Sequence, residues 1–290
     1  MKIVKSSVLK LNTPIKRLMV HAMKPFANNF ILLNHQKKAK RNCVNVDYWD
    51  GANLGDAISP VVVNYMLRQK GLSMDTNVNG TKHLFAIGSV ITAGVQDGTV
   101  WGSGVLYTTL GYRIKNRDLD IRSVRGPMTR LVLMEYGYSV PEIYGDPAIF
   151  MPEIYMPEKI EKKYKYGIVA HKNGSKYIDD LEKLDGNYCF IDIKTTDYKK
   201  FVDDLTSVEY VISSSLHGII LAESYGIPAI LVQPEFSLFK YYDWYCGTGR
   251  ANFPIIKSLA EVKTEKFLPV PDLSGIKENV RNAFPYDLYK

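Results

Sequence analysis

Short apolar, β-rich runs alternate with segments of helical spacing along most of the chain after residue 42. In the first half these runs predict strands at 43–49, 84–88, 100–104 and 119–124, with 140–144 as a further candidate. In the second half they predict strands at 166–170, 188–193, 209–212 and 229–232. Alternation of this kind is typical of parallel βα units, so the pattern predicts an α/β protein.

Capping residues and helix breakers mark the expected helices. Ser59 fits an N-cap, Pro60 fits the first helical position, and Gly71 fits the end of the same helix. Further helices are predicted at 127–136, 197–205, 218–225 and 275–283.

The alternation is interrupted at residues 150–165, where two prolines and a cluster of charges occur. We place the boundary between two lobes there. The predicted division is an extension of residues 1–42, an N-terminal lobe of residues 43–155 and a C-terminal lobe of residues 156–290. Each lobe is expected to be Rossmann-like, with a parallel sheet facing a shared cleft. Ligands of open α/β sheets bind beyond the carboxyl ends of the strands, so site residues are expected just after strands.

The chain has 290 residues, 46% of them hydrophobic and 23% charged, which is enough for a sizeable core. Its net charge of +7 is concentrated at the start, because residues 1–42 contain ten Lys or Arg and no Asp or Glu. Such a segment is attracted to anionic surfaces such as lipid head groups, although a solvated extension has the same composition. Nucleic acid is not an expected partner, because no DNA- or RNA-binding motif accompanies the charge.

Three cysteines at wide spacing, Cys43, Cys189 and Cys246, predict free thiols in a reducing compartment. Cys43 and Cys189 fall in or beside apolar runs and are expected to be buried. No apolar run reaches the roughly 18–20 residues of a membrane span, and the N-terminus lacks a signal-peptide pattern. We therefore expect a cytoplasmic protein, with residues 1–42 available for peripheral binding to the inner face of the membrane. No metal-ligand spacing of His, Cys or carboxylates occurs, so no metal is expected.

The run Ser213-Ser214-Ser215-Leu216-His217-Gly218 follows a predicted strand and opens a helix. Helix N-termini present unpaired N–H groups and the positive end of the dipole, so anions bind there. The three hydroxyls would add donors, Gly218 would let the backbone approach a ligand, and His217 can transfer a proton near neutral pH. A capping serine followed by a core histidine is the structural alternative.

Arg125 follows a predicted strand of the first lobe and precedes Gly126-Pro127 at a helix start. Arginine suits phosphate and carboxylate groups through its bidentate geometry, so Arg125 is a candidate for binding an anionic substrate. Arg122 is the alternative, and a surface salt bridge is the structural explanation of either. Asp56, in the loop after the first strand, is a candidate acid or base or a brace for its loop.

Several of these motifs, in the same order, resemble those of the polysaccharide pyruvyl transferase family, over roughly residues 43–250. The resemblance lies in Asn53-Leu54-Gly55-Asp56, Ile87-Gly88-Ser89, Trp101-Gly102-Ser103-Gly104, Arg122-Ser123-Val124-Arg125-Gly126-Pro127, Tyr144-Gly145-Asp146-Pro147-Ala148, the serine–histidine run and Tyr225-Gly226-Ile227-Pro228.

The resemblance implies a fold similar to the two-lobed GT-B glycosyltransferases. It also implies transfer of an enolpyruvyl unit from phosphoenolpyruvate onto a sugar of a surface polysaccharide precursor, often lipid-linked, to form a pyruvate ketal without a further cofactor. Many members carry arginine where this chain has Ser215, although a subgroup that makes exopolysaccharide ketals carries serine there. The family often has histidine at the position of His171, which joins His217 and Asp56 as a catalytic candidate. The remaining expected substrate contacts are Asn53, Gly102 and Ser103.

Two other functions are compatible with the sequence. A glycosyltransferase on a similar fold would use a nucleotide-sugar, with Glu235 as a loose candidate for the ribose partner. A non-catalytic glycan- or anion-binding protein is the other alternative. Asp146 is expected to form a turn, and Tyr241, Tyr242, Trp244 and Tyr245 are expected to pack in the core rather than stack on a sugar.

Overall fold

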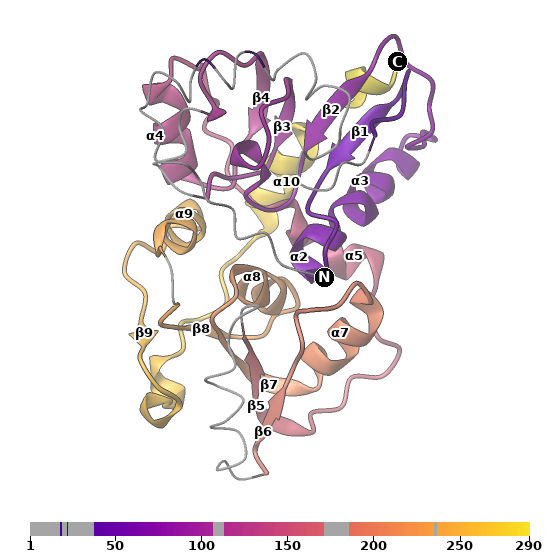
Figure 1. Cartoon of the computed structure of the whole chain (residues 1–290). Helices are drawn as coiled ribbons and strands as arrows, with labels where there is room; N and C mark the ends of the chain where they lie inside the picture. Colours follow the sequence, from indigo (N-terminus) through magenta and orange to yellow (C-terminus); the bar gives the residue numbers. More distant parts are fainter. Residues whose placement is uncertain (1–17, 19–21, 23–37, 107–112, 171–185, 235–236) are drawn as a thin grey trace, which may run out of the picture.

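The first sheet contains four parallel strands in sequential order. The computed structural model describes residues 18, 22, 38–106, 113–170, 186–234 and 237–290. The strands are β1 (Val44–Asp47), β2 (Lys82–Phe85), β3 (Gly98–Trp101) and β4 (Leu119–Ser123), in the order β1-β2-β3-β4. They form the upper lobe in Figure 1.

The second sheet contains five parallel strands with a crossover in their order. The strands are β5 (Tyr164–Val169), β6 (Tyr188–Phe190), β7 (Val208–Ser213), β8 (Ala229–Val232) and β9 (Ile255–Ile256), in the order β6-β5-β7-β8-β9. They form the lower lobe in Figure 1. The predicted fold class, an α/β protein with two lobes of parallel strands, is therefore confirmed.

Helices connect and cover the strands. They are α2 (Leu54–Ala57), α3 (Ser59–Arg68), α4 (Pro127–Glu135), α5 (Met151–Ile154), α7 (Tyr198–Thr206), α8 (Leu216–Ser224), α9 (Phe239–Gly247) and α10 (Ser274–Asn282). Short 3₁₀ turns include η2 (Val90–Thr92) and η4 (Pro147–Phe150). Asp197 caps α7 as a side-chain acceptor from Lys200 N.

Three local predictions are wrong, and one strand was not predicted. Residues 140–144 form no strand; only a single parallel bridge joins Val124 to Tyr144. Strand β9 lies outside the predicted set. The N-cap of α3 is Ile58 rather than Ser59, whose hydroxyl instead accepts a hydrogen bond from Ile87 N at 3.1 Å. The Ser59 hydroxyl therefore makes a hydrogen bond to a distant part of the chain and does not cap its own helix. Cys43 and Cys189 are free, as is Cys246, but they are half-buried rather than buried.

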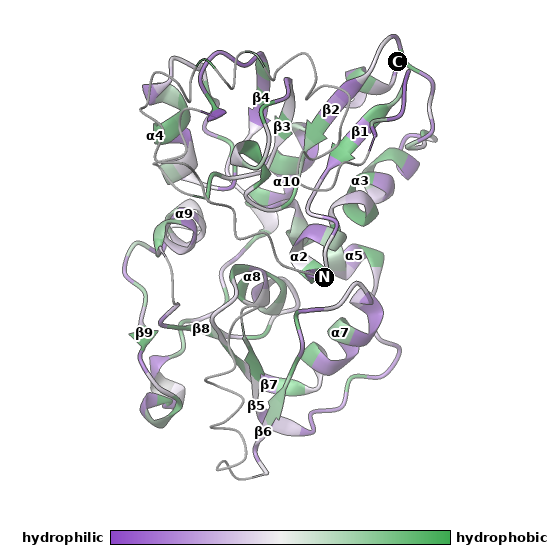
Figure 2. Ribbon diagram, in the orientation of Figure 1, coloured by the Kyte–Doolittle hydropathy of each residue, from purple (hydrophilic) through white to green (hydrophobic). Residues whose placement is uncertain are grey.

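Two of the strands are buried on both faces, as expected for strands of parallel sheets covered by helices. All four residues of β1 and all four of β8 are buried. In the hydropathy colouring, β1 and β2 contain both apolar and polar residues, and α7 is apolar on one side and polar on the other (Figure 2). Helix α8 is the exception among the helices, because every residue from Leu216 to Glu223 is buried. A helix that is apolar nearly all round lies in a core, and α8 lies between the second sheet and the first lobe (Figure 1).

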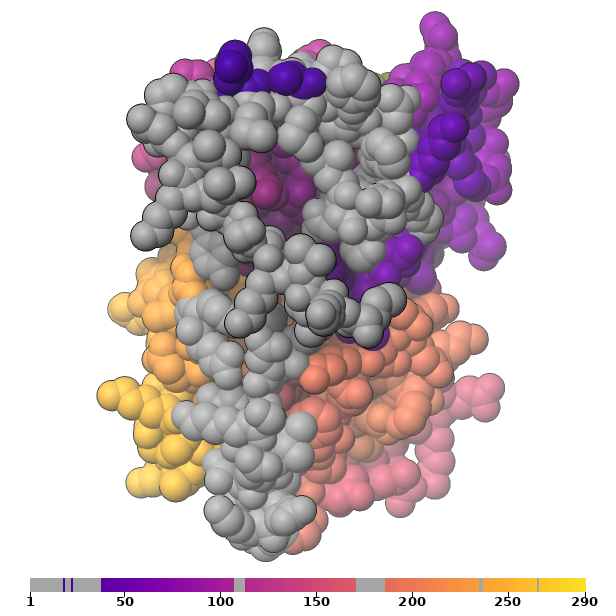
Figure 3. Space-filling view, in the orientation of Figure 1, coloured from indigo at the N-terminus to yellow at the C-terminus, as the bar shows by residue number. Residues whose placement is uncertain are grey.

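One continuous hydrophobic core crosses the boundary between the lobes. It contains Leu54 from α2, Phe150 from η4 and Leu216 from α8. The C-terminal segment returns from the second sheet to the first lobe, where Trp101 Nε1 donates a hydrogen bond of 2.7 Å to Val280 O. The chain end is drawn in the upper lobe in Figure 1, and the space-filling view shows the two lobes stacked one above the other (Figure 3). The shared core fixes the geometry of the cleft.

Within the described residues, no helix combines the length and the apolar character needed to cross a membrane. Most of the basic extension of residues 1–42 lies outside the described residues, so the expectation that it binds an anionic surface stays a prediction.

Candidate functional site

A cavity of about 270 Å³ lies between the lobes, at the carboxyl ends of strands from both sheets. The first lobe contributes Asn53 and Asp56 after β1, Gly88 and Ser89 after β2, and Arg125 after β4. The second lobe contributes Ser215, Leu216 and His217 after β7, and Lys240 from α9. The structure therefore brings five of the predicted site residues together: Asn53, Asp56, Arg125, Ser215 and His217.

The serine–histidine turn aims the start of α8 at the cavity. Ser215 occupies the N-cap position with extended backbone angles, and its side chain makes no capping hydrogen bond with the described helix. Ser213 Oγ instead organises the turn, because it accepts a hydrogen bond of 3.0 Å from Ser215 N and lies 2.9 Å from Val169 O. The first N–H groups of α8 and the Ser215 hydroxyl are thus left for a ligand.

His217 lies beside a buried carboxylate from the other lobe. Its Nε2 is 3.5 Å from Asp146 Oδ2, and neither atom has a hydrogen-bond partner among the described residues. The other carboxylate oxygen, Asp146 Oδ1, accepts a hydrogen bond of 3.0 Å from Ala148 N and caps η4. Asp146 is therefore a turn former, as predicted, but it also faces His217, which sequence reasoning missed.

The imidazole is held against a glycine on its opposite edge. A Cβ atom at Gly55 would lie 1.8 Å from His217 Nδ1, so only glycine leaves room for the ring. With Nε2 directed at Asp146, we assign the Nε2-protonated tautomer, and Nδ1 is the nitrogen left for proton exchange.

Asp56 is held by polar contacts on both sides. Asn53 Nδ2 donates a hydrogen bond to Asp56 Oδ2. Asp56 Oδ1 packs against Gly88, whose φ of +94° and close contact both exclude a larger residue. Burial raises the pKa of Asp56 to about 6, although His217, Asn53 and Lys240 favour the ionised form. A carboxyl group with a pKa near 6 can exchange protons at neutral pH.

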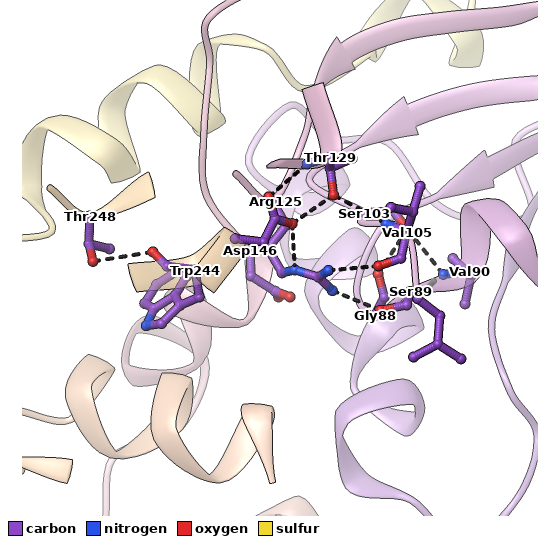
Figure 4. A network of polar contacts seen from close by, with 12 residues as sticks. Gly88, Ser89, Val90, Ser103, Val105, Arg125, Thr129, Asp146, Trp244 and Thr248 are labelled. Carbon is purple, nitrogen blue, oxygen red and sulfur yellow. Dashed lines mark hydrogen bonds and ion pairs between the residues drawn. The ribbon is translucent and has the colours of Figure 1, made fainter. Parts of the chain in front are cut away.

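Arg125 lines the cavity, but its guanidinium is already engaged (Figure 4). Nε donates to Asp243 Oδ2 at 3.0 Å, Nη1 donates to Ser89 Oγ at 2.8 Å, and Nη2 donates to Val105 O at 3.1 Å. Arg125 and Asp243 are both fully buried. Their ion pair fastens α9 to the first lobe, so Arg125 organises the cavity wall as well as adding charge to it.

Lys240 is a cavity residue that the sequence analysis did not identify. It lies in the first turn of α9, immediately before the aromatic residues assigned to core packing. Tyr241, Trp244 and Tyr245 do pack in the core, while Tyr242 is 39% exposed. Lys240 lies three residues before Asp243, and this helical spacing was the available signal that both side chains share the face toward the first lobe.

The other predicted site residues lie elsewhere. Arg122 is partly exposed and pairs with Asp120 and Asp287, each at 2.8 Å, because its side chain points to the opposite face of β4 from Ser123. Gly102 packs against Pro147, and Gly218 packs against Ser213 and Val169, so both serve close backbone approach within the fold. The serines Ser103, Ser213 and Ser214 are buried outside the cavity lining, where Ser103 Oγ donates to Gly88 O at 2.9 Å. His171 lies outside the described residues, so its role stays a prediction.

Comparison with known proteins agrees with the motifs. The family model described as polysaccharide pyruvyl transferase matches residues 99–235. Over this span, which is just under half of the chain, the sequence is similar to the polysaccharide pyruvyl transferase family. This confirms the resemblance inferred from the motifs, and the matched span contains Arg125, Asp146, Ser215 and His217 of the site.

Two relatives extend the match. The chain is 31% identical over 153 residues to the succinoglycan biosynthesis protein ExoV of Rhizobium meliloti, covering 50% of this chain and 46% of that protein. It is also 28% identical over 210 residues to an uncharacterized protein of Acanthamoeba polyphaga mimivirus, covering 68% of this chain and 71% of that protein. The pyruvyl transferase match and the relative from succinoglycan biosynthesis both point to polysaccharide synthesis.

Proposed function

We propose that this chain transfers an enolpyruvyl unit from phosphoenolpyruvate onto a sugar of a surface polysaccharide precursor and closes it into a pyruvate ketal. The observation that carries the proposal is that one small cavity between two lobes gathers cationic groups, a helix N-terminus, a carboxyl group and His217, with Asp146 buried beside the His217 ring. The match to the family model supports the pyruvyl transfer, and the cavity supports the anionic donor.

The size and charge of the cavity fit a small dianion. Its volume of about 270 Å³ falls just below the roughly 300–1,000 Å³ of pockets for drug-sized ligands. A three-carbon phosphate ester fits such a space better than a nucleotide-sugar does. The N-terminus of α8 and the Ser215 hydroxyl offer hydrogen-bond donors to a phosphate, and Arg125 adds a fixed positive charge.

The reaction moves protons at two points. The methylene carbon of the donor gains a proton, the first sugar hydroxyl bonds to the adjacent carbon and loses its proton, and the phosphate leaves with the electrons of its C–O bond. The second hydroxyl then bonds to the same carbon and loses its proton, which balances the charge on the released phosphate. An acid and a base are therefore both needed close to the donor.

Asp56 and His217 fit these two roles. His217 Nε2 lies against the Asp146 carboxylate, and Asp56 lines the same cavity as His217. We assign His217 Nδ1 as the proton donor to carbon and Asp146 as the residue that orients the ring. Asp56, whose pKa is raised to about 6, is assigned as the base that accepts the proton of the sugar hydroxyl. These groups belong to the chain itself, so we expect turnover without an added metal or organic cofactor.

A lipid-linked acceptor is part of the proposal. The ten basic residues within residues 1–42 would hold the protein at an anionic membrane surface, where lipid carriers are displayed. This places the proposed reaction on the cytoplasmic face of the membrane.

The deciding experiment incubates the full chain with phosphoenolpyruvate and a panel of lipid-linked and free glycans in D₂O. The expected result is release of inorganic phosphate together with a glycan that carries one added pyruvate and a single deuterium in its methyl group. Parallel reactions contain nucleotide-sugars and no phosphoenolpyruvate. Nucleotide release there, or binding of glycan with no turnover of either donor, would overturn the proposal in favour of a glycosyltransferase or a binding protein.

A further inference from the structure

Lys240 is a cation of the cavity that forms no ion pair with any described carboxylate. Arg125, the other cation of the lining, is bound to Asp243. The carboxyl group whose charge favours the Lys240 ammonium is that of Asp56, across the cavity. A partly buried ammonium without a close counter-ion favours the binding of an external anion.

The position of Lys240 is fixed by the anchoring of α9. Three residues along the helix, Asp243 accepts hydrogen bonds from Thr129 N at 2.8 Å and Thr129 Oγ1 at 2.6 Å, in addition to the ion pair with Arg125. Thr129 N belongs to the first turn of α4, so Asp243 acts as an N-cap for that helix from a distant part of the chain. Residues three apart lie on one helix face, so this anchor directs Lys240 toward the cleft.

A second contact places Lys240 beside the serine–histidine turn. Its Nζ lies 5.0 Å from the centre of the Tyr241 ring, and the Tyr241 hydroxyl donates a hydrogen bond of 2.6 Å to Ser214 O. The ammonium is thus held on the side of the cavity where Ser215 and the N-terminus of α8 open. A phosphate group requires several hydrogen-bond donors that point to one place. This side of the cavity offers an ammonium, a hydroxyl and the N–H groups of a helix N-terminus.

We propose that Lys240 binds the phosphate of the donor, together with the Ser215 hydroxyl and the N-terminal N–H groups of α8. The inference rests on the proposed function, because it identifies which end of the donor faces which lobe. The carboxylate end then lies toward Arg125 and Ser89. Burial lowers the pKa of Lys240 to about 8, and the nearby charge of Arg125 adds to this effect. The side chain is therefore still mostly an ammonium at neutral pH, although burial has removed part of its hydration.

The test measures binding separately from turnover. Trp49 lines the cavity, so its fluorescence reports ligand binding when inorganic phosphate, phosphoenolpyruvate or pyruvate is added to the full chain. Lys240→Met keeps an unbranched stem over Tyr241 and removes the charge, and Lys240→Arg keeps the charge. Lys257→Met, at an exposed position, is the control for the same change in net charge.

We expect Lys240→Met to weaken the binding of phosphate and of phosphoenolpyruvate by about tenfold to a hundredfold, the usual cost of losing a hydrogen bond to a charged group. Pyruvate binding should change less than threefold, Lys240→Arg should recover most of the phosphate affinity, and Lys257→Met should match the wild type. The affinity of the wild type for phosphate should also fall as the pH rises through about 8, because Lys240 then loses its charge. The other titratable groups among the described residues that line the cavity are Asp56, His217 and Arg125.

The outcomes separate this inference from the proposed function. If the wild type converts phosphoenolpyruvate but Lys240→Met binds phosphate normally, the assignment of Lys240 is wrong and the pyruvyl transfer stands. If Lys240→Met weakens pyruvate but not phosphate, the orientation of the donor is reversed and the inference fails. If phosphate binding depends on Lys240 but no glycan ever gains pyruvate, the site is an anion site and the proposed function fails.

Discussion

Asp146 Oδ2 lies 3.5 Å from His217 Nε2, and the two side chains approach each other from different lobes. Both atoms are buried and have no other polar partner among the residues the structure describes. The distance is longer than a hydrogen bond, as is common for catalytic pairs without substrate. The pair couples the histidine of the serine turn to the start of η4, so the shared core between the lobes also sets the orientation of the imidazole.

The first prediction concerns Asp146→Asn. This change keeps an oxygen for the cap at Ala148 N but removes the negative charge facing His217. We expect kcat to fall by about 10²–10⁴, the usual contribution of general acid–base catalysis, with little change in KM for the donor. The pH–rate profile distinguishes a role of Asp146 in orienting His217 from a role in the fold alone. If Asp146 only supports the fold, kcat should fall equally at every pH. If its charge acts on His217, the pH of maximal kcat should also move.

The second prediction concerns Asp56→Asn, with opposite effects on stability and activity. The pKa of Asp56 is raised from 3.8 to about 6 in the folded protein, so the folded state loses stability as pH rises between these values and the carboxyl ionises. Asparagine removes this cost, which amounts to at most about 3 kcal/mol above pH 6. We expect a higher melting temperature at pH 8, no gain at pH 4, and a fall in turnover of at least about a hundredfold. A melting temperature unchanged at pH 8 would contradict the raised pKa.

Most of the fold was predictable, because apolar runs, breakers and capping residues are local signals. Eight of the nine strands in the described residues coincide with predicted runs to within a few residues at each end. By contrast, 140–144 forms only a bridge, and β9, with two residues, is too short to have a pattern. His217 was predictable because Gly218 and the serines mark a strand-to-helix turn. The place of Lys240 in the cavity and the contact of Asp146 with His217 were not predictable from the sequence. Both depend on how helices and loops of one lobe pack against the other lobe.

The third prediction concerns the stability that Arg125 contributes. The sequence analysis identified Arg125 as a candidate for binding an anionic substrate, and in the structure this residue also forms a buried ion pair with Asp243 that is part of the fold. Removing one partner leaves an uncompensated buried charge, so we expect a loss of about 3–5 kcal/mol of unfolding free energy. Chemical denaturation measures it. The double variant Arg125→Met/Asp243→Leu should be more stable than Arg125→Ala, and equal instability of the two would argue against the charge as the cause.

The fourth prediction concerns the basic extension. Deleting residues 1–37, which contain seven of the ten basic residues of residues 1–42, should weaken binding to anionic vesicles. Each basic residue near such a surface contributes about 1 kcal/mol, so the loss should be large at low salt and small at high salt. Turnover of a water-soluble glycan should be unchanged. Cosedimentation with vesicles of varied anionic lipid content measures the binding, and equal binding of the deleted and full chains would contradict a membrane role.

The last prediction concerns Gly55, a glycine that lies against the imidazole ring of His217. A Cβ atom at Gly55 would lie 1.8 Å from His217 Nδ1, so Gly55→Ala must displace the imidazole. A displacement of about 1 Å costs on the order of a hundredfold in rate, and we expect a fall of that size in kcat. Gly275→Ala is the matched control, because this helical glycine has no heavy atom near its added Cβ.

A double-mutant cycle shows whether the displacement acts through the ring. In a His217→Ala background, where there is no imidazole to move, Gly55→Ala should cause less than about a threefold further loss, because the effects of contacting residues are not additive. Melting temperatures of all four proteins exclude unfolding as the cause. A hundredfold loss in both backgrounds would show that Gly55 affects catalysis by a route other than the His217 ring. The contact between Gly55 and His217 Nδ1 would then give no support to Nδ1 as the nitrogen that exchanges the proton.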